Sequence, residues 1–423
     1  MESASRKLAE KITLLGGIAA VSIILVFGIR GQLGNMISEG VVPGDPATAA
    51  LALSGETISP YDPKTMWLAS VTRYEGVDRE MAGNLAGELL RTIEMSPHDF
   101  RWWVERGKAL ERAGRTEEAE RHLQRAVELA PRYSSPRWHL GNFYLRSARL
   151  DKSLEHFAVA ARADAQYREE IFALIDDFFG NPQVEFAKIV GDDPDLLVTL
   201  SKYHAVRGRF TESLSAWNRL SALDKKRLEI FGMEIVQITY DRKGFLTASK
   251  ILRDLGRETV TPGRLEDGGF EQNFRDAGEV FFGWRFSTRD RVDVRADGRS
   301  SREGKRSLRI SFDGTVQEFL GNASQIVVVQ PGSRYRLSYW LRGEGIRSAG
   351  PPRIQVIDLS ANESLVNGPA VKGSFDWTRQ ILEFKVPSGV EGVLLTLNRE
   401  SCGADCPIYG LLWLDGLAVE EIK

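Results

Sequence analysis

The sequence predicts a multidomain protein with a single N-terminal transmembrane helix, an all-α solenoid and a C-terminal all-β sandwich. An uncharged apolar run near the start indicates the membrane helix, a repeat of 34 residues indicates the solenoid, and alternating apolar residues in the last third indicate the sandwich. The chain has 423 residues, more than one hydrophobic core normally serves, which agrees with several domains.

The membrane helix is expected over residues 12–29, where only Thr13 and Ser22 are polar. A helix of that length measures about 27 Å, close to the roughly 30 Å hydrocarbon core of a bilayer. A cleaved signal peptide is the alternative, but the run does not end in a small-residue cleavage pattern. We therefore expect an uncleaved anchor.

Basic residues set the expected orientation of this anchor. Arg6, Lys7 and Lys11 precede the apolar run, whereas only Arg30 closely follows it. By the positive-inside rule, residues 1–11 form a cytoplasmic tail. The expected location is a bacterial inner membrane, crossed once, with the body of the protein in the periplasm.

Residues 30–62 are predicted to be a linker of no fixed shape, because glycines and prolines are frequent and the apolar periodicity is weak. These glycines and prolines are Gly34, Gly40, Pro43, Gly44, Pro46, Gly55 and Pro60.

The solenoid is expected over residues 63–260, where apolar residues follow helical spacing. Gly107 and Gly141 lie 34 positions apart, as do Ala126 and Ala160. One unit supplies Trp103, Gly107, Leu110, Gly114, Ala119, Leu123, Ala126 and Pro131, and the next supplies Leu140, Gly141, Tyr144, Phe157 and Ala160. These positions resemble the tetratricopeptide repeat, which implies stacked helix pairs that bind protein partners.

The resemblance implies a binding groove lined mainly by the first helix of each pair. Its expected peptide-contacting residues are Arg101, Lys108, Arg112, Trp138, Asn142 and Arg146. Guanidinium and amide donors suit carboxylates, so an extended peptide, a terminal carboxylate or an acidic sugar fits this set. Ordinary solvated helix positions are the alternative.

The sandwich is expected over residues 264–423, where apolar and polar residues alternate as in half-buried strands. Asp267-Gly268-Gly269-Phe270-Glu271, Gly304 to Ile310 and Trp413 to Leu417 follow in order. They resemble the jelly-roll carbohydrate-binding modules of families 4 and 9, and more broadly galactose-binding-like sandwiches. This resemblance implies sugar binding by aromatic faces flanked by polar groups. Alternation places Trp340 with Arg336 and Arg342, and we expect Trp377 and Gln355 on neighbouring strands.

The same resemblance implies a structural calcium ion held by Glu271 and Asp415, the opening and closing carboxylates of the domain. The family often closes with Asp-Asp, whereas this chain has Asp415-Gly416, which removes one ligand. Ordinary polar strand ends are the alternative. No other cofactor is expected.

The only two cysteines, Cys402 and Cys406, lie four positions apart. In an oxidising compartment they can close a small disulfide loop, whereas two thiols without a nearby histidine make a poor zinc site. We expect a structural disulfide.

Charge and motifs narrow the function. The chain carries 56 basic and 58 acidic side chains, so no global field draws it to nucleic acid. Nucleophile elbows, zinc-protease helices and phosphate loops are missing from the sequence, so we expect no enzyme and no catalytic residues. The predicted function is a membrane-anchored adaptor for protein partners and a polysaccharide, in envelope or exopolysaccharide assembly. A pure protein scaffold is the alternative, and a carbohydrate-active enzyme is a weaker one.

Overall fold

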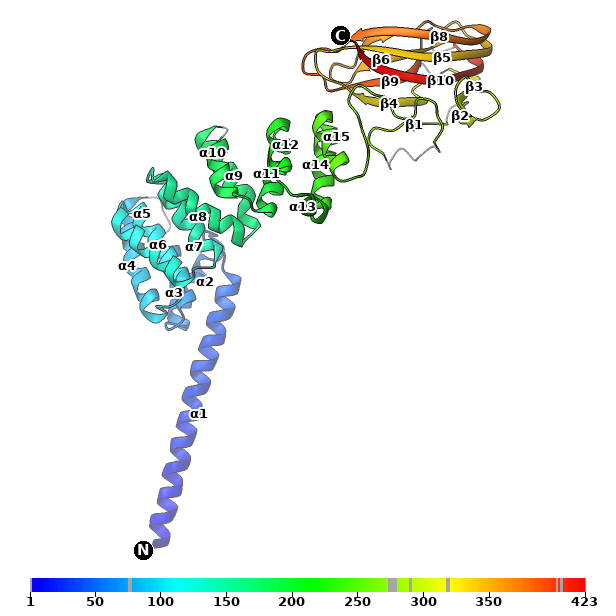
Figure 1. The fold of residues 1–423 in the computed structure, drawn as a ribbon. Helices are drawn as coiled ribbons and strands as arrows, with labels where there is room; N and C mark the ends of the chain where they lie inside the picture. The colour runs from blue at the N-terminus through cyan, green and yellow to red at the C-terminus, as the bar shows by residue number, and fades with distance from the viewer. Residues whose placement is uncertain are drawn as a thin grey trace. The chain divides into compact units, whose positions relative to one another are not determined.

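The computed structural model describes residues 2–74, 78–180, 182–272, 280–288, 291–316, 320–400, 402–403 and 406–422, with side chains from Lys11 onward. In these residues, fifteen helices precede ten strands (Figure 1). The chain divides into two compact units, residues 1–191 and 192–423. The side chains of Arg6 and Lys7 in the predicted cytoplasmic tail lie outside the described residues.

The first unit contains helices joined by turns, with no strand in its described residues. Its helices are α1 (Glu2–Gly40), α2 (Ala49–Ile58), α3 (Pro63–Arg73), α4 (Arg79–Met95), α5 (Phe100–Arg112), α6 (Thr116–Leu129), α7 (Ser134–Arg146), α8 (Leu150–Ala163), α9 (Gln166–Phe179) and α10 (Gln183–Val190).

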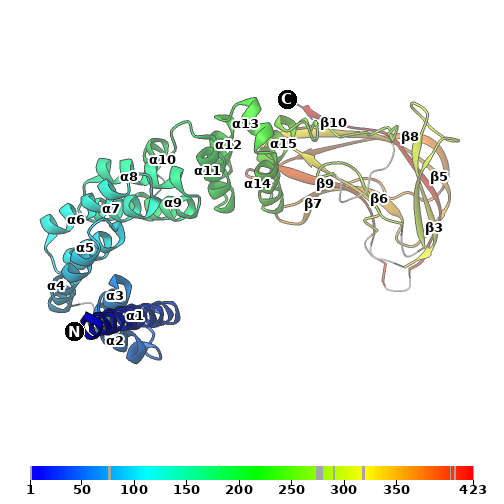
Figure 2. The ribbon, with the colours of Figure 1, turned by 90° about the horizontal axis from the view of Figure 1, so that it is seen from below.

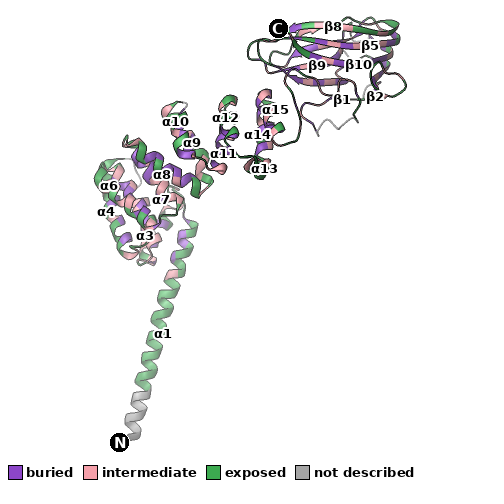
Figure 3. Ribbon diagram, in the orientation of Figure 1, coloured by how far each residue is buried: buried purple, intermediate pink, exposed green. Residues whose placement is uncertain are grey.

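Helix α1 contains the predicted apolar span and continues eleven residues past Ile29 to Gly40. Its segment from Lys11 has an 18-residue window of mean hydropathy 2.6, none of which is buried. Figure 3 shows the described part of α1 mostly exposed, with buried and intermediate residues near its C-terminal end. This helix is long and apolar enough to cross a membrane, and a signal sequence has the same properties.

The predicted linker is wrong, because most of residues 30–62 is helical and packed. Ile37 of α1, Ala52 of α2 and Leu68 of α3 belong to one buried cluster. Two of the glycines permit close helix contact, since a Cβ at Gly34 would lie 2.7 Å from the Ser59 side chain and one at Gly55 would lie 3.2 Å from Ile37. Gly34 and Gly55 therefore mark tight packing, and the end of α1 is joined to the first solenoid helices.

Helices α5 to α8 form two helix pairs, as the repeat predicts. Their glycines lie at the contacts, because a Cβ at Gly107 or Gly141 would come within 2.7 Å of the Leu123 or Phe157 side chain. At the start of α5, the side chain of Asp99 accepts a hydrogen bond from the Arg101 backbone N–H at 3.1 Å. These local features explain why the helices begin and pack where the repeat places them.

The second unit begins with helices α11 (Pro194–Val206), α12 (Phe210–Asn218), α13 (Ala222–Arg227), α14 (Glu229–Asp241) and α15 (Phe245–Asp254). These helices group with the sandwich, whereas the sequence assigned residues 63–260 to one solenoid. Tyr240 packs its ring against Phe281 and Phe282, with centroids 5.2 and 5.4 Å apart. The Leu246 backbone N–H donates to Glu391 Oε2 at 2.9 Å. Burial of these aromatic rings joins the last helices to the sandwich.

The sandwich contains strands β1 (Arg285–Phe286), β2 (Val292–Asp297), β3 (Ser307–Thr315), β4 (Ala323–Val328), β5 (Arg334–Arg347), β6 (Pro352–Asp358), β7 (Glu363–Asn367), β8 (Gly373–Lys385), β9 (Gly392–Arg399) and β10 (Ile408–Ile422). One sheet has the order β1-β4-β9-β6-β7 and the other β2-β3-β10-β5-β8, and all their pairings are antiparallel. Figure 2 shows strands of the two sheets on opposite sides of the domain.

The alternation read from the sequence decides which side chains enter the core. Tyr335, Leu337, Tyr339 and Leu341 of β5 are buried between the sheets. The intervening residues of β5, which include Trp340, therefore lie on the outer face of the β2-β3-β10-β5-β8 sheet. The predicted multidomain fold is confirmed.

Candidate functional site

A groove of about 790 Å³ lies over α3, α5 and α7 in the first unit. Its lining residues are Pro43, Trp67, Val71, Glu105, Lys108, Glu111, Arg112, Trp138, His139, Asn142 and Arg146. Five of the six predicted groove residues belong to this set. The volume is within the range of ordinary ligand pockets.

Arg101 is the predicted groove residue that the structure places elsewhere. It lies two helical turns before Lys108, at the beginning of α5, and its Nη2 contacts Asp99 Oδ2 at 2.6 Å. Its guanidinium lies 5.3 Å from the centre of the Trp102 ring. The repeat pattern gives the correct helix face but not the length of the groove along that face.

Two of the three cations in the groove are paired with carboxylates. Lys108 Nζ lies 2.9 Å from Glu105 Oε1, and Arg146 Nε lies 2.7 Å from Glu111 Oε1. The side chain of Arg112 forms no ion pair or hydrogen bond within the described part of the chain. The groove is therefore less basic than expected, and its accessible positive charge is concentrated at one guanidinium.

Neutral and aromatic groups surround these charges. The Trp138 ring packs against Phe157 and Tyr167, with both pairs of centroids 5.4 Å apart, and Asn142 Nδ2 donates to the Trp138 carbonyl at 2.9 Å. Burial lowers the pKa of His139 to about 4, with a further contribution from Lys108. His139 is consequently neutral near pH 7. Indole surface beside a guanidinium suits an apolar side chain followed by a carboxylate.

On the sandwich, the predicted sugar-binding residues are already engaged in contacts. The guanidinium of Arg302 lies 4.4 Å from the centre of the Trp340 ring, and Trp340 Nε1 donates to Glu303 Oε1 at 3.1 Å. Arg342 lies 4.9 Å from the Trp413 ring centre. The loop between β2 and β3 therefore covers part of the indole face that the sequence assigned to sugar.

The remaining predicted sugar-binding residues divide between the two sheets. Arg336 pairs with Glu383 at 2.7 Å, and Trp377 lies on β8, the neighbour of β5. Gln355 is not beside them, because β6 belongs to the opposite sheet, where Asn398 Nδ2 donates to Gln355 Oε1 at 2.7 Å. The chain crosses between sheets after β5, which strand alternation alone does not reveal.

The two predicted calcium ligands accept hydrogen bonds from one loop. Asp415 Oδ2 accepts the N–H groups of Arg302 and Glu303 at 2.6 and 2.9 Å, and Asp415 Oδ1 accepts that of Gly416 at 2.7 Å. Glu271 Oε1 accepts the N–H groups of Lys305 and Arg306 at 2.6 and 3.0 Å.

This donor set does not fit a cation. N–H groups present positive partial charge where calcium would require oxygen ligands. Backbone hydrogen bonds from Arg306 and Lys305 lower the pKa of Glu271, whereas burial raises the pKa of Asp415. No cluster of three or more His, Cys, Asp or Glu side chains at metal-binding distance occurs in the described residues. Backbone N–H groups of the β2–β3 loop therefore bind the two carboxylates that the resemblance assigned to calcium.

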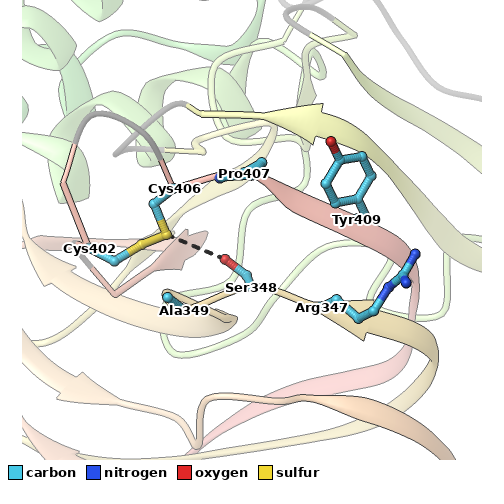
Figure 4. Close-up of a pocket in the computed structure, with 7 residues that line it drawn as sticks. All are labelled: Arg347, Ser348, Ala349, Cys402, Cys406, Pro407 and Tyr409. Carbon is cyan, nitrogen blue, oxygen red and sulfur yellow. Dashed lines mark hydrogen bonds between the residues drawn. A yellow bond between two sulfur atoms is a disulfide. The ribbon is translucent and has the colours of Figure 1, made fainter.

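The structure joins Cys402 and Cys406 in a disulfide beside a cavity of about 480 Å³ (Figure 4). Arg399, 4 % exposed, lies beneath it and donates to the Ser348 hydroxyl and the Cys406 carbonyl, both at 2.8 Å. The disulfide and the buried arginine together hold the ends of β5, β9 and β10.

The helix pair α5–α6 matches a known family of repeats. Residues 100–133 match the tetratricopeptide repeat family. The predicted resemblance of the first clear unit is thereby confirmed, and its two helices are α5 and α6. No curated protein sequence matches the chain.

Three solved structures are similar to parts of this chain. A family 4 carbohydrate-binding module has 12% identity and a TM-score of 0.29, over 37% of this chain and 99% of that chain. A family 61 module solved with β-1,4-galactotriose has 19% identity and a TM-score of 0.27, over 38% and 100%. A structure of MamA MSR-1 has 20% identity and a TM-score of 0.24, over 28% of this chain and 67% of that chain.

The sequence prediction did not name Pro43, Trp67, Val71, Glu105 or His139 among the residues of the groove. Glu105 had a detectable signal, because it lies one turn before Lys108 on the same helix face. Trp67 and Val71 had none, since their position depends on how α3 stacks. Pro43 lay in the segment that the sequence assigned to a linker.

Proposed function

We propose that this protein is a membrane-anchored adaptor whose tetratricopeptide groove binds an extended segment of a protein partner. The observation that carries the proposal is the unpaired guanidinium of Arg112 in a groove that also contains Trp67 and Trp138. Such a groove suits a peptide with an apolar or aromatic side chain next to a carboxylate. We assign it no catalytic role.

The proposed location is a bacterial inner membrane, with residues 1–11 in the cytoplasm and the two folded units in the periplasm. The exposed apolar surface of α1 supports a bilayer rather than water around it. The disulfide between Cys402 and Cys406 supports an oxidising compartment.

Site-specific photo-crosslinking tests the groove. A photoreactive phenylalanine replaces Trp138 in the groove or Tyr133, which is 62% exposed and absent from the groove lining. In membranes of cells that express the chain, we expect a protein adduct at Trp138 and none of the same size at Tyr133. Arg112→Glu in the same chain should reduce that adduct. Equal adducts at both positions, or no effect of Arg112→Glu, would contradict the proposal.

A second candidate function is polysaccharide binding by the outer face of the β2-β3-β10-β5-β8 sheet, in envelope or exopolysaccharide assembly. Its support is the stack of Arg302 on Trp340, a half-buried ring on that outer face. A glycan that displaces Arg302 would gain an indole face flanked by charged and polar groups.

A glycan array separates this candidate from a pure protein scaffold. We expect Trp340→Ala to abolish binding and Arg302→Ser to strengthen it, because the arginine no longer competes for the ring. Arg299→Ser in the same loop is the matched control. If the protein binds no glycan on the array, polysaccharide binding is rejected and the pure protein scaffold is retained.

A further inference from the structure

The turn between α2 and α3 lies beside the apolar part of α1. The rings of Phe27 and Tyr61 have centroids 6.5 Å apart, although 34 positions separate them in the sequence. Both side chains are exposed, Phe27 by 59% and Tyr61 by 77%. An exposed tyrosine therefore lies next to a residue of the membrane span.

Hydrogen bonds hold the turn in this position. Arg30 Nε donates to the Ile58 carbonyl and Arg30 Nη2 to the Thr57 carbonyl, both at 2.8 Å. These are the last carbonyls of α2, which a helix leaves without internal partners. Arg30 follows the span directly, so it joins the edge of the span to the end of α2.

The position of Phe27 sets the depth of the turn. It precedes the end of the apolar run at Ile29 by two residues, or about 3 Å along a helix axis. Helix α1 continues without interruption to Gly40, so this depth does not depend on a hinge. The ring of Tyr61 consequently lies near the boundary of the hydrocarbon layer, where tyrosine is favoured because its ring is apolar and its hydroxyl is polar.

The cavity beside the turn has the mixed lining expected at that boundary. It measures about 380 Å³, and its lining includes Phe27 and Arg30 of α1 together with Ser59, Tyr61 and Asp62 of the turn. The carboxylate of Asp62 accepts the Thr65 backbone N–H at 3.0 Å as the cap of α3. This hydrogen bond offsets part of the free-energy cost of moving the carboxylate out of water.

We propose that the α2–α3 turn is a second membrane contact, in which Tyr61 inserts into the headgroup layer of a phospholipid bilayer beside α1. This inference rests on the proposed placement of α1 in a membrane. The contact fixes the first solenoid helices against the bilayer surface, whereas a flexible tether would let them move away from it.

Spin-label accessibility in the full-length protein tests the contact. Single variants Tyr61→Cys, Phe27→Cys and Tyr133→Cys are labelled with a nitroxide in phosphatidylethanolamine–phosphatidylglycerol vesicles. The native cysteines are joined in a disulfide and do not react. We expect the ratio of collisions with oxygen to collisions with a water-soluble nickel complex to be severalfold higher at Tyr61 than at Tyr133.

Three other outcomes would contradict the proposed lipid contact, each for a different reason. A water-accessible label at Tyr61 with a lipid-buried label at Phe27 overturns the second contact and leaves the anchor. Water-accessible labels at both positions overturn the anchor itself. Spin–spin broadening of the label at Tyr61 could persist when the protein is diluted in lipid. That result would show that the turn contacts a second copy of the chain, and it would overturn the lipid contact.

Discussion

Arg146 and Glu111 form a two-point ion pair between α7 and α5, with Arg146 Nε and Nη2 donating to the two carboxylate oxygens at 2.7 and 2.9 Å. The residues are 35 positions apart, so the ion pair joins nearly equivalent positions of two successive helix pairs. It neutralises a cation that the sequence assigned to ligand binding. The pair controls how much positive charge the groove offers.

Glu111→Gln should release Arg146 for an acidic ligand. We expect an acidic peptide to bind roughly two- to tenfold more tightly, equivalent to about 0.4 to 1.4 kcal/mol, by fluorescence anisotropy. The free energy of unfolding should change by less than about 1 kcal/mol, because the pair is partly exposed. Glu128→Gln is the control, since it frees Arg125 on α6 outside the groove lining. Equal affinity gains in both variants would show an effect of net charge alone.

Gly141→Ala should destabilise the second helix pair. The added Cβ would lie 2.7 Å from the Phe157 ring, so we expect a loss of about 1 to 3 kcal/mol through overpacking. Gly87→Ala is the matched control, because a Cβ there meets nothing within 4 Å and alanine favours a helix. Thermal unfolding followed by far-UV circular dichroism measures both. Similar behaviour of the two variants would refute the packing role.

The first unit should lose stability in acid through two histidines. Burial lowers the pKa of both His139 and His156 to about 4. The unfolded chain, with a histidine pKa of about 6.5, binds these protons more readily, so stability present above pH 6.5 decreases as the pH falls towards about 4.

The double variant His139→Gln with His156→Gln should flatten this decrease, as measured by urea unfolding across the same pH range. His98→Gln, at an exposed position, serves as its control. An unchanged pH dependence in the double variant would assign the acid sensitivity to other groups.

Calcium should not stabilise the sandwich. The Asp415 and Glu271 carboxylates accept backbone N–H groups, so we expect the same unfolding temperature in calcium and in chelator. Asp415→Ala should cost about 1 to 3 kcal/mol, because it removes the buried acceptor of three partly buried backbone hydrogen bonds. A calcium-dependent rise in unfolding temperature that Asp415→Ala removes would restore the metal site.

Much of the fold follows from periodicity in the sequence. Gly107, Gly141, Leu123 and Phe157 identify the helix pairs because each glycine meets a large side chain of the next helix. Alternation at Tyr339, Trp340 and Leu341 correctly separates core from outer face. Such patterns are readable because burial repeats with the period of the helix or strand.

The errors arise where distant segments meet. Gly34 and Gly55 have the composition of a linker, yet they permit α1, α2 and α3 to pack closely. Gln355 is separated from Trp340 because β5 and β6 belong to different sheets. Local sequence specifies neither contact, since each depends on which element arrives from elsewhere in the chain.

The sequence by itself determined the apolar span, the helix pairs, the strand alternation and the cysteine pair, because each is a local or periodic property. Only the tertiary structure decided which charges remain available: Glu111 neutralises Arg146, Arg302 covers Trp340, and backbone amides satisfy Asp415. The physical reason is that a side chain's hydrogen-bonding and charge capacity is divided among all its neighbours, and most of those neighbours are distant in sequence.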